Sequence, residues 1–205
     1  MWGRRAVSAD LAEPPAQPGG IGVEHERWIW IERQLTKNDG ESMSLPAEIS
    51  GRETPAGDGS ALDALIDFYR SFNGSDLKAL AANWAEGEAP SMDNPIGGIR
   101  RGWPAIREGY AKLFGGPAIV RVAFHDFVAQ GNDDFHLFVG REKGTCETPA
   151  VRLELRIRTS RWFVKMRGVW RQLHHHGSID EPALLADYQR AILGTPLGGP
   201  AAGRW

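Results

Sequence analysis

At 205 residues, the chain is long enough for one substantial hydrophobic core, or for one domain with an extension. Its formal net charge of −2 gives no whole-protein argument for binding nucleic acid or an acidic membrane surface. No run approaches the roughly 20 apolar residues of a membrane helix. The single cysteine, Cys146, excludes an intramolecular disulfide and a cysteine-rich metal site, so we expect a reducing, cytoplasmic setting.

The first 58 residues differ in composition from the rest of the chain. Five prolines and several Gly and Ser clusters interrupt them, and no hydrophobic periodicity is sustained, which predicts a poorly ordered extension. Within it, segment 25–35 has apolar residues at helical spacing. A short amphipathic helix that docks on a partner or on the chain's own domain is therefore an alternative. A third alternative is that translation begins at Met43.

Three amphipathic helices are predicted next, each with apolar residues at steps of three and four. Ser60, with Asp63 three residues later, is close to a capping box. Turn signals at Asn94-Pro95 and Gly97-Gly98 predict a short hairpin or an irregular arm between the second and third helices. The helices are expected to start at Ser60, at Ser75 or Asp76, and at Pro104, and to stop at Asn73-Gly74, after Trp84 and at Gly115-Gly116.

Segments rich in β-branched and aromatic residues follow the helices and predict strands. A last helix is expected to begin with Asp180 as its cap and Pro182 in its first turn. Helices followed by antiparallel hairpins predict an α+β fold rather than alternating βαβ units. The expected strands span 119–129, 135–143, 151–166 and 169–176, and a tight turn at Arg167-Gly168 joins the last two.

Side-chain alternation changes phase once within the longest predicted strand. Odd positions are apolar over 151–157, whereas even positions are apolar beyond Ser160. A side-chain period of two cannot change parity without an extra residue, so a β-bulge near Thr159-Ser160 is predicted. The bulge would bend the sheet around a cavity and place Arg161 on the same face as Arg158. The alternative is that this arginine-rich face is simply solvated.

The last predicted strand ends in a run of histidines. Its alternation places Trp170, Gln172, His174 and His176 on one face. Two histidines at this spacing can ligate a metal, but spacing alone places no third ligand, so neither a metal site nor a cofactor is expected. The preferred interpretation is that His174 and His176 are hydrogen-bonded polar groups that line a partly buried pocket.

The end of this hairpin has the pattern G-x-W-x-x-x-H-x-H-x-S, formed by Gly168, Trp170, His174, His176 and Ser178. After three helices and a bent sheet, this pattern resembles the nuclear transport factor 2-like (SnoaL-like) superfamily, and most of all the association-domain group of calcium/calmodulin-dependent protein kinase II with its bacterial single-domain relatives. The resemblance implies a cone domain over 59–194, followed by a loose tail. That cone has three N-terminal helices packed on a strongly bent antiparallel sheet, an internal pocket and a C-terminal helix.

The resemblance also implies a homodimer or higher homo-oligomer, and it assigns pocket residues. Segment 160–163 matches a family strand whose arginine corresponds to Arg161, and the preceding strand supplies Arg141. Both are implied to point into the cone, where two guanidiniums would suit a carboxylate or another small anion. Two aromatic residues would add apolar lining, with plain core packing as their alternative. The expected ligand-binding residues are Arg141, Arg161, His174, His176, Trp84 and Tyr69.

Binding of a small molecule without chemistry is the preferred functional interpretation, because paired arginines are present and a clear acid–base pair is not. The alternative is an isomerase, dehydratase or cyclase, which needs a base near the reacting carbon and a donor for the oxyanion. A third class is pure assembly through the outer face of the sheet. Neither nucleic acid nor a membrane is expected as a partner. Candidate bases are Asp93, His125, Asp126 and His174, and candidate donors are Tyr69 and Tyr110.

Overall fold

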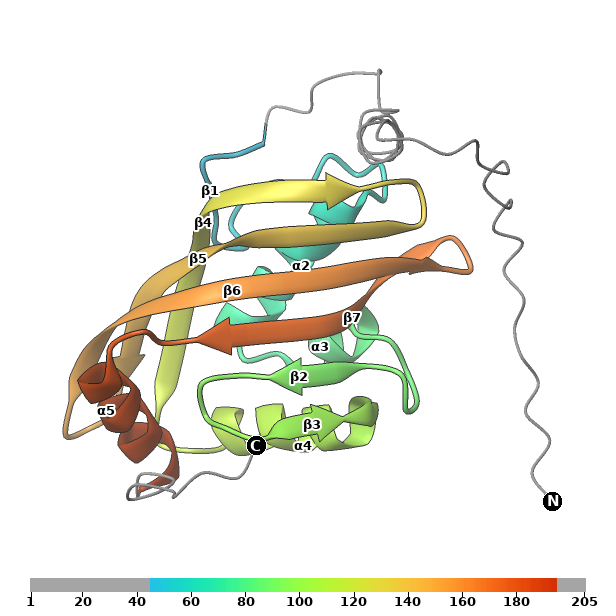
Figure 1. The fold of residues 1–205 in the computed structure, drawn as a ribbon. Helices are drawn as coiled ribbons and strands as arrows, with labels where there is room; N and C mark the ends of the chain where they lie inside the picture. Colours follow the sequence, from blue (N-terminus) through green and yellow to red (C-terminus); the bar gives the residue numbers. More distant parts are fainter. Residues whose placement is uncertain (1–44, 195–205) are drawn as a thin grey trace, which may run out of the picture. The chain divides into compact units, whose positions relative to one another are not determined.

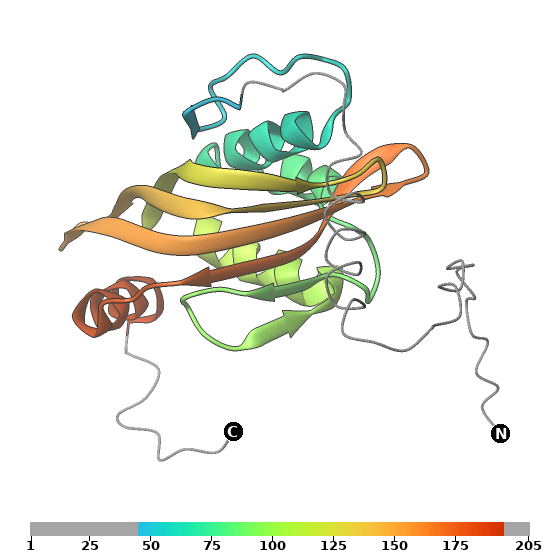
Figure 2. The ribbon, with the colours of Figure 1, turned by 45° about the horizontal axis from the view of Figure 1, so that its top comes forward.

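The computed structural model describes residues 45–194, so the predictions for segments 25–35 and 195–205 lie outside the described residues. One sheet of seven strands runs in the order β1-β4-β5-β6-β7-β2-β3, and helices α2, α3 and α4 cover one of its faces (Figures 1 and 2). The strands are β1 (Glu48–Ile49), β2 (Ser91–Asp93), β3 (Ile99–Arg101), β4 (Ile119–Gly131), β5 (Phe135–Glu147), β6 (Arg152–Met166) and β7 (Val169–Ser178). The helices are α2 (Ala61–Asn73), α3 (Leu77–Asn83), α4 (Gly102–Phe114) and α5 (Pro182–Leu193).

The first two helices begin where the capping residues predicted. The Ser60 side chain accepts a hydrogen bond from the backbone N–H of Asp63 at 3.2 Å. Asp76 caps α3 by accepting hydrogen bonds from two backbone N–H groups of its first turn. α5 has Pro182 in its first turn, as predicted, but the predicted cap was wrong. Asp180 forms an ion pair with Arg158 at 2.5 Å, and the N-cap position is Glu181, without a side-chain cap.

The predicted hairpin between α3 and α4 exists and adds two strands to the sheet. β2 pairs antiparallel with β3 and parallel with β7. The sheet is therefore mixed, whereas the sequence predicted only antiparallel strands. The hairpin brings its own residues beside the end of β7, although some 80 residues separate them in the chain. The hairpin thereby forms one side of a cavity between the helices and the sheet.

The predicted bulge at Thr159-Ser160 was wrong. β6 pairs with β5 in continuous register from Arg152 to Val164, and its odd positions face the helices throughout. Arg161 is therefore buried, at 3% exposure, and lies on the opposite face from Arg158. The apolar pattern changed phase because a threonine and an arginine occupy core-facing positions, not because the backbone gained a residue.

The extra residue lies in β7 instead. The pairing of β6 with β7 shifts between Trp162 and Phe163, which leaves Leu173 as the inserted residue. Gln172 is buried before the shift, and His175 is buried after it. The predicted common face of Trp170, Gln172, His174 and His176 therefore ends at Gln172, and the histidine that enters the core is His175.

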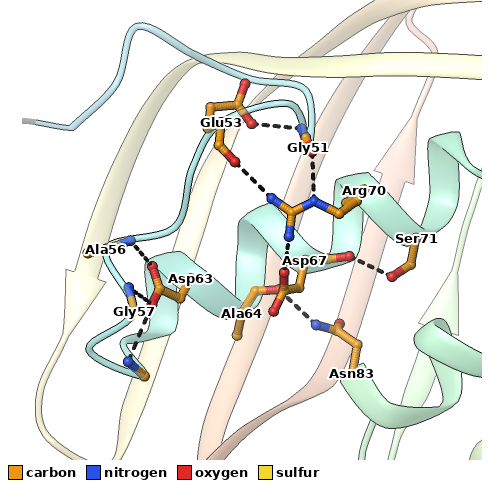
Figure 3. Close-up of polar contacts among 11 residues, drawn as sticks. Gly51, Glu53, Ala56, Gly57, Asp63, Ala64, Asp67, Arg70, Ser71 and Asn83 are labelled. Carbon is orange, nitrogen blue, oxygen red and sulfur yellow. Dashed lines mark hydrogen bonds and ion pairs between the residues drawn. The ribbon is translucent and has the colours of Figure 1, made fainter.

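Residues 45–58 are bound to the domain, although the sequence predicted a poorly ordered extension up to residue 58. β1 pairs with β4 at the edge of the sheet. Arg70 on α2 donates hydrogen bonds to the carbonyl groups of Gly51 and Glu53 at 3.0 and 2.8 Å (Figure 3). The buried carboxylate of Asp63 accepts hydrogen bonds from backbone N–H groups at Ala56 and Gly57, both at 2.9 Å (Figure 3). These contacts fix the chain as it enters α2.

Candidate ligand-binding site

An interior cavity of about 50 Å³ lies between the helices and the sheet. It is large enough for a few non-hydrogen atoms or for one or two water molecules. Apolar side chains form most of its walls, and a small polar group lies among them. Its apolar lining includes Phe68, Phe72, Leu113, Val120, Val122 and Ile157, and its polar lining includes Arg100, Tyr110, Glu142, Arg161, His175 and Tyr188.

A buried ion pair forms the polar wall of this interior cavity. Arg161 Nη2 lies 2.9 Å from Glu142 Oε1, and both side chains are at most 5% exposed. Arg161 also donates hydrogen bonds to Tyr69 Oη at 3.1 Å and to Gln172 Oε1 at 3.2 Å. Its guanidinium lies 3.6 Å from the centroid of the Phe68 ring, where the π face adds attraction. The two charges of the pair cancel within the core.

The carboxylate of Glu142 uses only one of its oxygens in this network. Oε1 accepts hydrogen bonds from Tyr69 Oη at 2.7 Å and from Arg161, whereas Oε2 accepts none from residues 45–194. Burial raises the pKa of Tyr69 well above its ordinary value, so the phenol keeps the proton that it donates. Burial likewise raises the pKa of Tyr110 to about 12. Oε2 of Glu142 is therefore free to accept a hydrogen bond from a bound molecule.

His175 stands directly opposite Arg161 in the β6–β7 register. Burial, and then the nearby positive charge of Arg161, hold the pKa of His175 well below its ordinary value, so the imidazole is neutral near pH 7. Its Nδ1 is buried without a hydrogen-bond partner among the described residues. The same is true of Gln172 Nε2 within this part of the chain. Such atoms are rare in folded proteins and mark places where a ligand or water binds.

The structure does not bring the predicted arginine pair together. Arg141 lies on the outer face of the sheet, away from the helices, where its side chain is 56% exposed and 3.5 Å from Asp126. Arg161 lies on the inner face. His174 and His176 also lie outside the interior cavity, His174 Nδ1 at 2.8 Å from Ser91 Oγ and His176 near Asp93. No single ligand can contact all four side chains.

The two aromatic residues are part of the core rather than of the cavity wall. Trp84 is fully buried, forms a β-bridge with Gln172, and packs against the rings of Trp103 and Tyr110. Tyr69 is also fully buried, and its hydroxyl belongs to the ion-pair network. Neither residue is among those that line the interior cavity.

The candidate acid–base residues of the sequence are also outside this cavity, because Asp93, His125, Asp126 and His174 do not line it. Glu142 and His175 line it instead, and sequence reasoning missed both. Glu142 left a signal, since it is a charge at an even position of β5, where Phe138 and Cys146 are buried. The sequence carried no usable signal for His175, because its side chain faces the core only as a result of the insertion at Leu173.

The described part of the chain contains neither a candidate metal site nor a candidate membrane-spanning helix. Residues 45–194 contain no group of three or more His, Cys, Asp or Glu side chains placed to hold a metal ion. None of the helices in the same range is long and apolar enough to cross a membrane.

Comparisons with known proteins agree with this fold. A family model described as the SnoaL-like domain matches residues 61–181. A proposed calcium/calmodulin-dependent protein kinase type II association domain from Thiobacillus denitrificans has a TM-score of 0.52 at 18% identity, covering 60% of this chain and 96% of its own. A proposed dehydratase of the NTF2-like family from Streptomyces avermitilis has a TM-score of 0.52 at 17% identity, covering 56% and 90%. The calcium/calmodulin-dependent protein kinase II hub of S. rosetta has a TM-score of 0.51 at 17% identity, covering 61% and 98%. No curated protein matches the chain in sequence.

Proposed function

Because the chain belongs to the SnoaL-like domain family, we propose that it is a cytoplasmic protein that binds a small carboxylate or another small anion in its interior cavity. The observation that carries the proposal is a buried, unpartnered polar atom on a residue that lines this cavity, His175 Nδ1. A second such atom, Gln172 Nε2, belongs to the side chain that Arg161 of the cavity wall binds. Each such atom costs about 1–3 kcal/mol when it stays unpaired. A ligand with matching groups would recover part of that cost.

A second candidate function rests on Glu142. Glu142, with its free Oε2, and the neutral His175 line the same cavity, and such a pair of groups can move a proton, as an isomerase, dehydratase or cyclase requires. The likeness to the Streptomyces avermitilis protein, a proposed dehydratase, favours the same reading. Glu142 and His175 would then be the acid–base groups, in place of those that the sequence suggested.

Thermal melting with short carboxylates tests the binding proposal. At a ligand concentration of 100 Kd, binding adds about 2.7 kcal/mol to the free energy of unfolding. For a chain of this size, that corresponds to a rise in Tm of roughly 5–10 °C. Formate and acetate suit the volume of about 50 Å³ of the interior cavity, and propionate and butyrate test its upper limit. Ligand-observed NMR on the same samples would detect turnover, and a new product signal would favour the enzyme.

The matched control for this experiment is Arg141→Met. Arg141 lies on the outer face, so this variant should respond to the carboxylates as the wild-type chain does. A wild-type Tm that no acid of the series raises would contradict binding in the interior cavity. A response that disappears in Arg141→Met would place the site on the outer face.

We also propose a homodimer formed through the outer face of the sheet. Several apolar side chains are exposed there, and pairing between β5 and β6 places Leu137 beside Trp162. Such contiguous apolar patches mark interfaces more often than solvated surface. The likeness to the S. rosetta hub supports the proposal. The exposed residues are Val128, Phe135, Val139 and Trp162, with exposures of 53, 37, 41 and 42%.

Sedimentation velocity checks the dimer. The wild-type chain is expected to sediment as a dimer at micromolar concentration, and Trp162→Glu as a monomer, because a charge at the centre of the patch cannot be desolvated without a partner. Arg141→Glu, on the same face and already exposed, is the control for added negative charge. A wild-type monomer at these concentrations would refute the proposal.

A further inference from the structure

Gly109 lies in the middle of α4, where glycine is unfavourable. In a helix interior it costs about 0.8–1.0 kcal/mol relative to alanine. Its helical backbone would accept alanine, but an added Cβ would lie 2.7 Å from Arg100 Nε and 3.1 Å from Arg100 Cδ and Cζ. The missing side chain therefore leaves space for the guanidinium of Arg100.

Arg100 points inward from β3, at the edge of the sheet. It pairs with Met92, which is 2% exposed, whereas its neighbours Ile99 and Arg101 are exposed. Strand alternation thus turns the side chain of Arg100 toward the helices, and both Arg100 and Gly109 line the interior cavity. The half-buried guanidinium covers Gly109 at the margin of this cavity.

Arg100 forms no ion pair or side-chain hydrogen bond within residues 45–194. Lys112, bound to Glu108 at 2.6 Å, and then the charge of Arg100 lower the pKa of Glu108, but this carboxylate does not line the cavity. The other charges of the cavity wall, Arg161 and Glu142, cancel each other at 2.9 Å, and His175 is neutral. The lining therefore carries one net positive charge, and a single negative charge would balance it.

We propose that Arg100, seated over Gly109, is the residue that determines specificity by binding the carboxylate of a short-chain monocarboxylate. The inference rests on the proposed function, since it names the anion-binding residue of the same cavity. The apolar body of the ligand lies against the apolar walls, and its carboxylate meets the guanidinium of Arg100. Arg161 does not take this role because Glu142 already occupies it, and Arg141 does not because it lies on the outer face.

A competing role for an inward-pointing arginine at a sheet edge is to prevent edge-to-edge association. That role requires the charge of Arg100 but not its position over Gly109. Gly109→Ala separates the two roles, because the new methyl group displaces the guanidinium and leaves its charge unchanged. The substitution should not lower stability, since alanine is the better residue in a helix.

The experiment compares acetate with acetamide, which has the same shape without the charge, by NMR titration of the full chain. The wild-type chain is expected to bind acetate at least tenfold more tightly. Gly109→Ala should weaken acetate binding about tenfold and leave acetamide within twofold, with Tm unchanged or raised. Arg100→Gln should bind the two probes equally, and Arg101→Gln, on the exposed side of the same strand, should behave as wild type.

The outcomes distinguish a failure of the assignment of Arg100 from a failure of the proposed function. If the wild-type chain binds both probes equally, or if Gly109→Ala and Arg100→Gln retain its preference, the assignment of Arg100 is overturned while binding in the cavity stands. If neither probe nor any other short carboxylate binds the wild-type chain, the proposed function fails and this inference fails with it.

Discussion

Arg161→Met is expected to lower the free energy of unfolding by about 3–5 kcal/mol, because it leaves the buried carboxylate of Glu142 without its cation. The loss would be larger than that from an ordinary polar substitution. Glu142 is 5% exposed, so bulk water cannot replace the guanidinium as its partner. Tyr69 and Gln172 would also lose the hydrogen bonds that they receive from the guanidinium. Urea unfolding at pH 7 measures the difference.

Two further variants make this test specific. Arg141→Met removes an arginine from the outer face, where its ion pair with Asp126 is exposed, and should cost at most about 1 kcal/mol. Glu142→Leu combined with Arg161→Met replaces both charges with apolar groups and should recover most of the loss. A cost for Arg161→Met no larger than that for Arg141→Met would show that the buried pair does not hold the core together.

Trp84→Ala is expected to cost about 3–5 kcal/mol, the range for truncating a fully buried large aromatic side chain. Trp84 follows α3 in extended conformation and forms a parallel bridge with Gln172 of β7. The next N–H, from Ala85, donates to the carbonyl of Gln172 at 3.0 Å. The indole therefore packs where the helical layer joins the sheet, and its removal leaves a cavity at that junction.

Trp84→Phe is the matched control, because it keeps an aromatic ring against Trp103 and Tyr110 and should lose clearly less stability than the alanine variant. Thermal melting of both variants checks the ranking. The binding of short carboxylates should survive in whatever fraction of Trp84→Ala remains folded, since Trp84 does not line the interior cavity. Loss of binding without loss of stability would instead show that Trp84 contacts the ligand, as expected from the sequence.

The elements of the domain were predictable because their signals are local. Ser60 and Asp63 interact across one helical turn, and Arg167 and Gly168 form a turn between adjacent strands with φ of 53° and 80°. The predicted ends of the strands fell short by a few residues, as for β5, which continues to Glu147. Where a strand ends depends on how far the neighbouring strand pairs with it, and the local sequence pattern carries no information on that pairing.

The site was only partly predictable, because a side chain's face depends on every residue inserted along its strand. Arg161 faces the helices, as the family resemblance implied, whereas the bulge that was predicted to place it on the face of Arg158 does not exist. The real insertion, at Leu173, lies in a segment of mixed polarity where either register fits the pattern. One residue there decides whether His174 or His175 enters the core. Composition gave no reason to prefer either.

Capping, periodicity and turn chemistry act over a few residues, so the helices, the order of the long strands and the family could be predicted from the chain alone. Which charges meet depends on the tertiary structure. Glu142 and Arg161 are 19 residues apart in the chain and join through strand register. Arg100 and Gly109 meet because an edge strand turns its arginine over a helix that lacks a side chain at that point. Such pairs depend on how the helices and strands pack against one another, and no local sequence pattern encodes that packing.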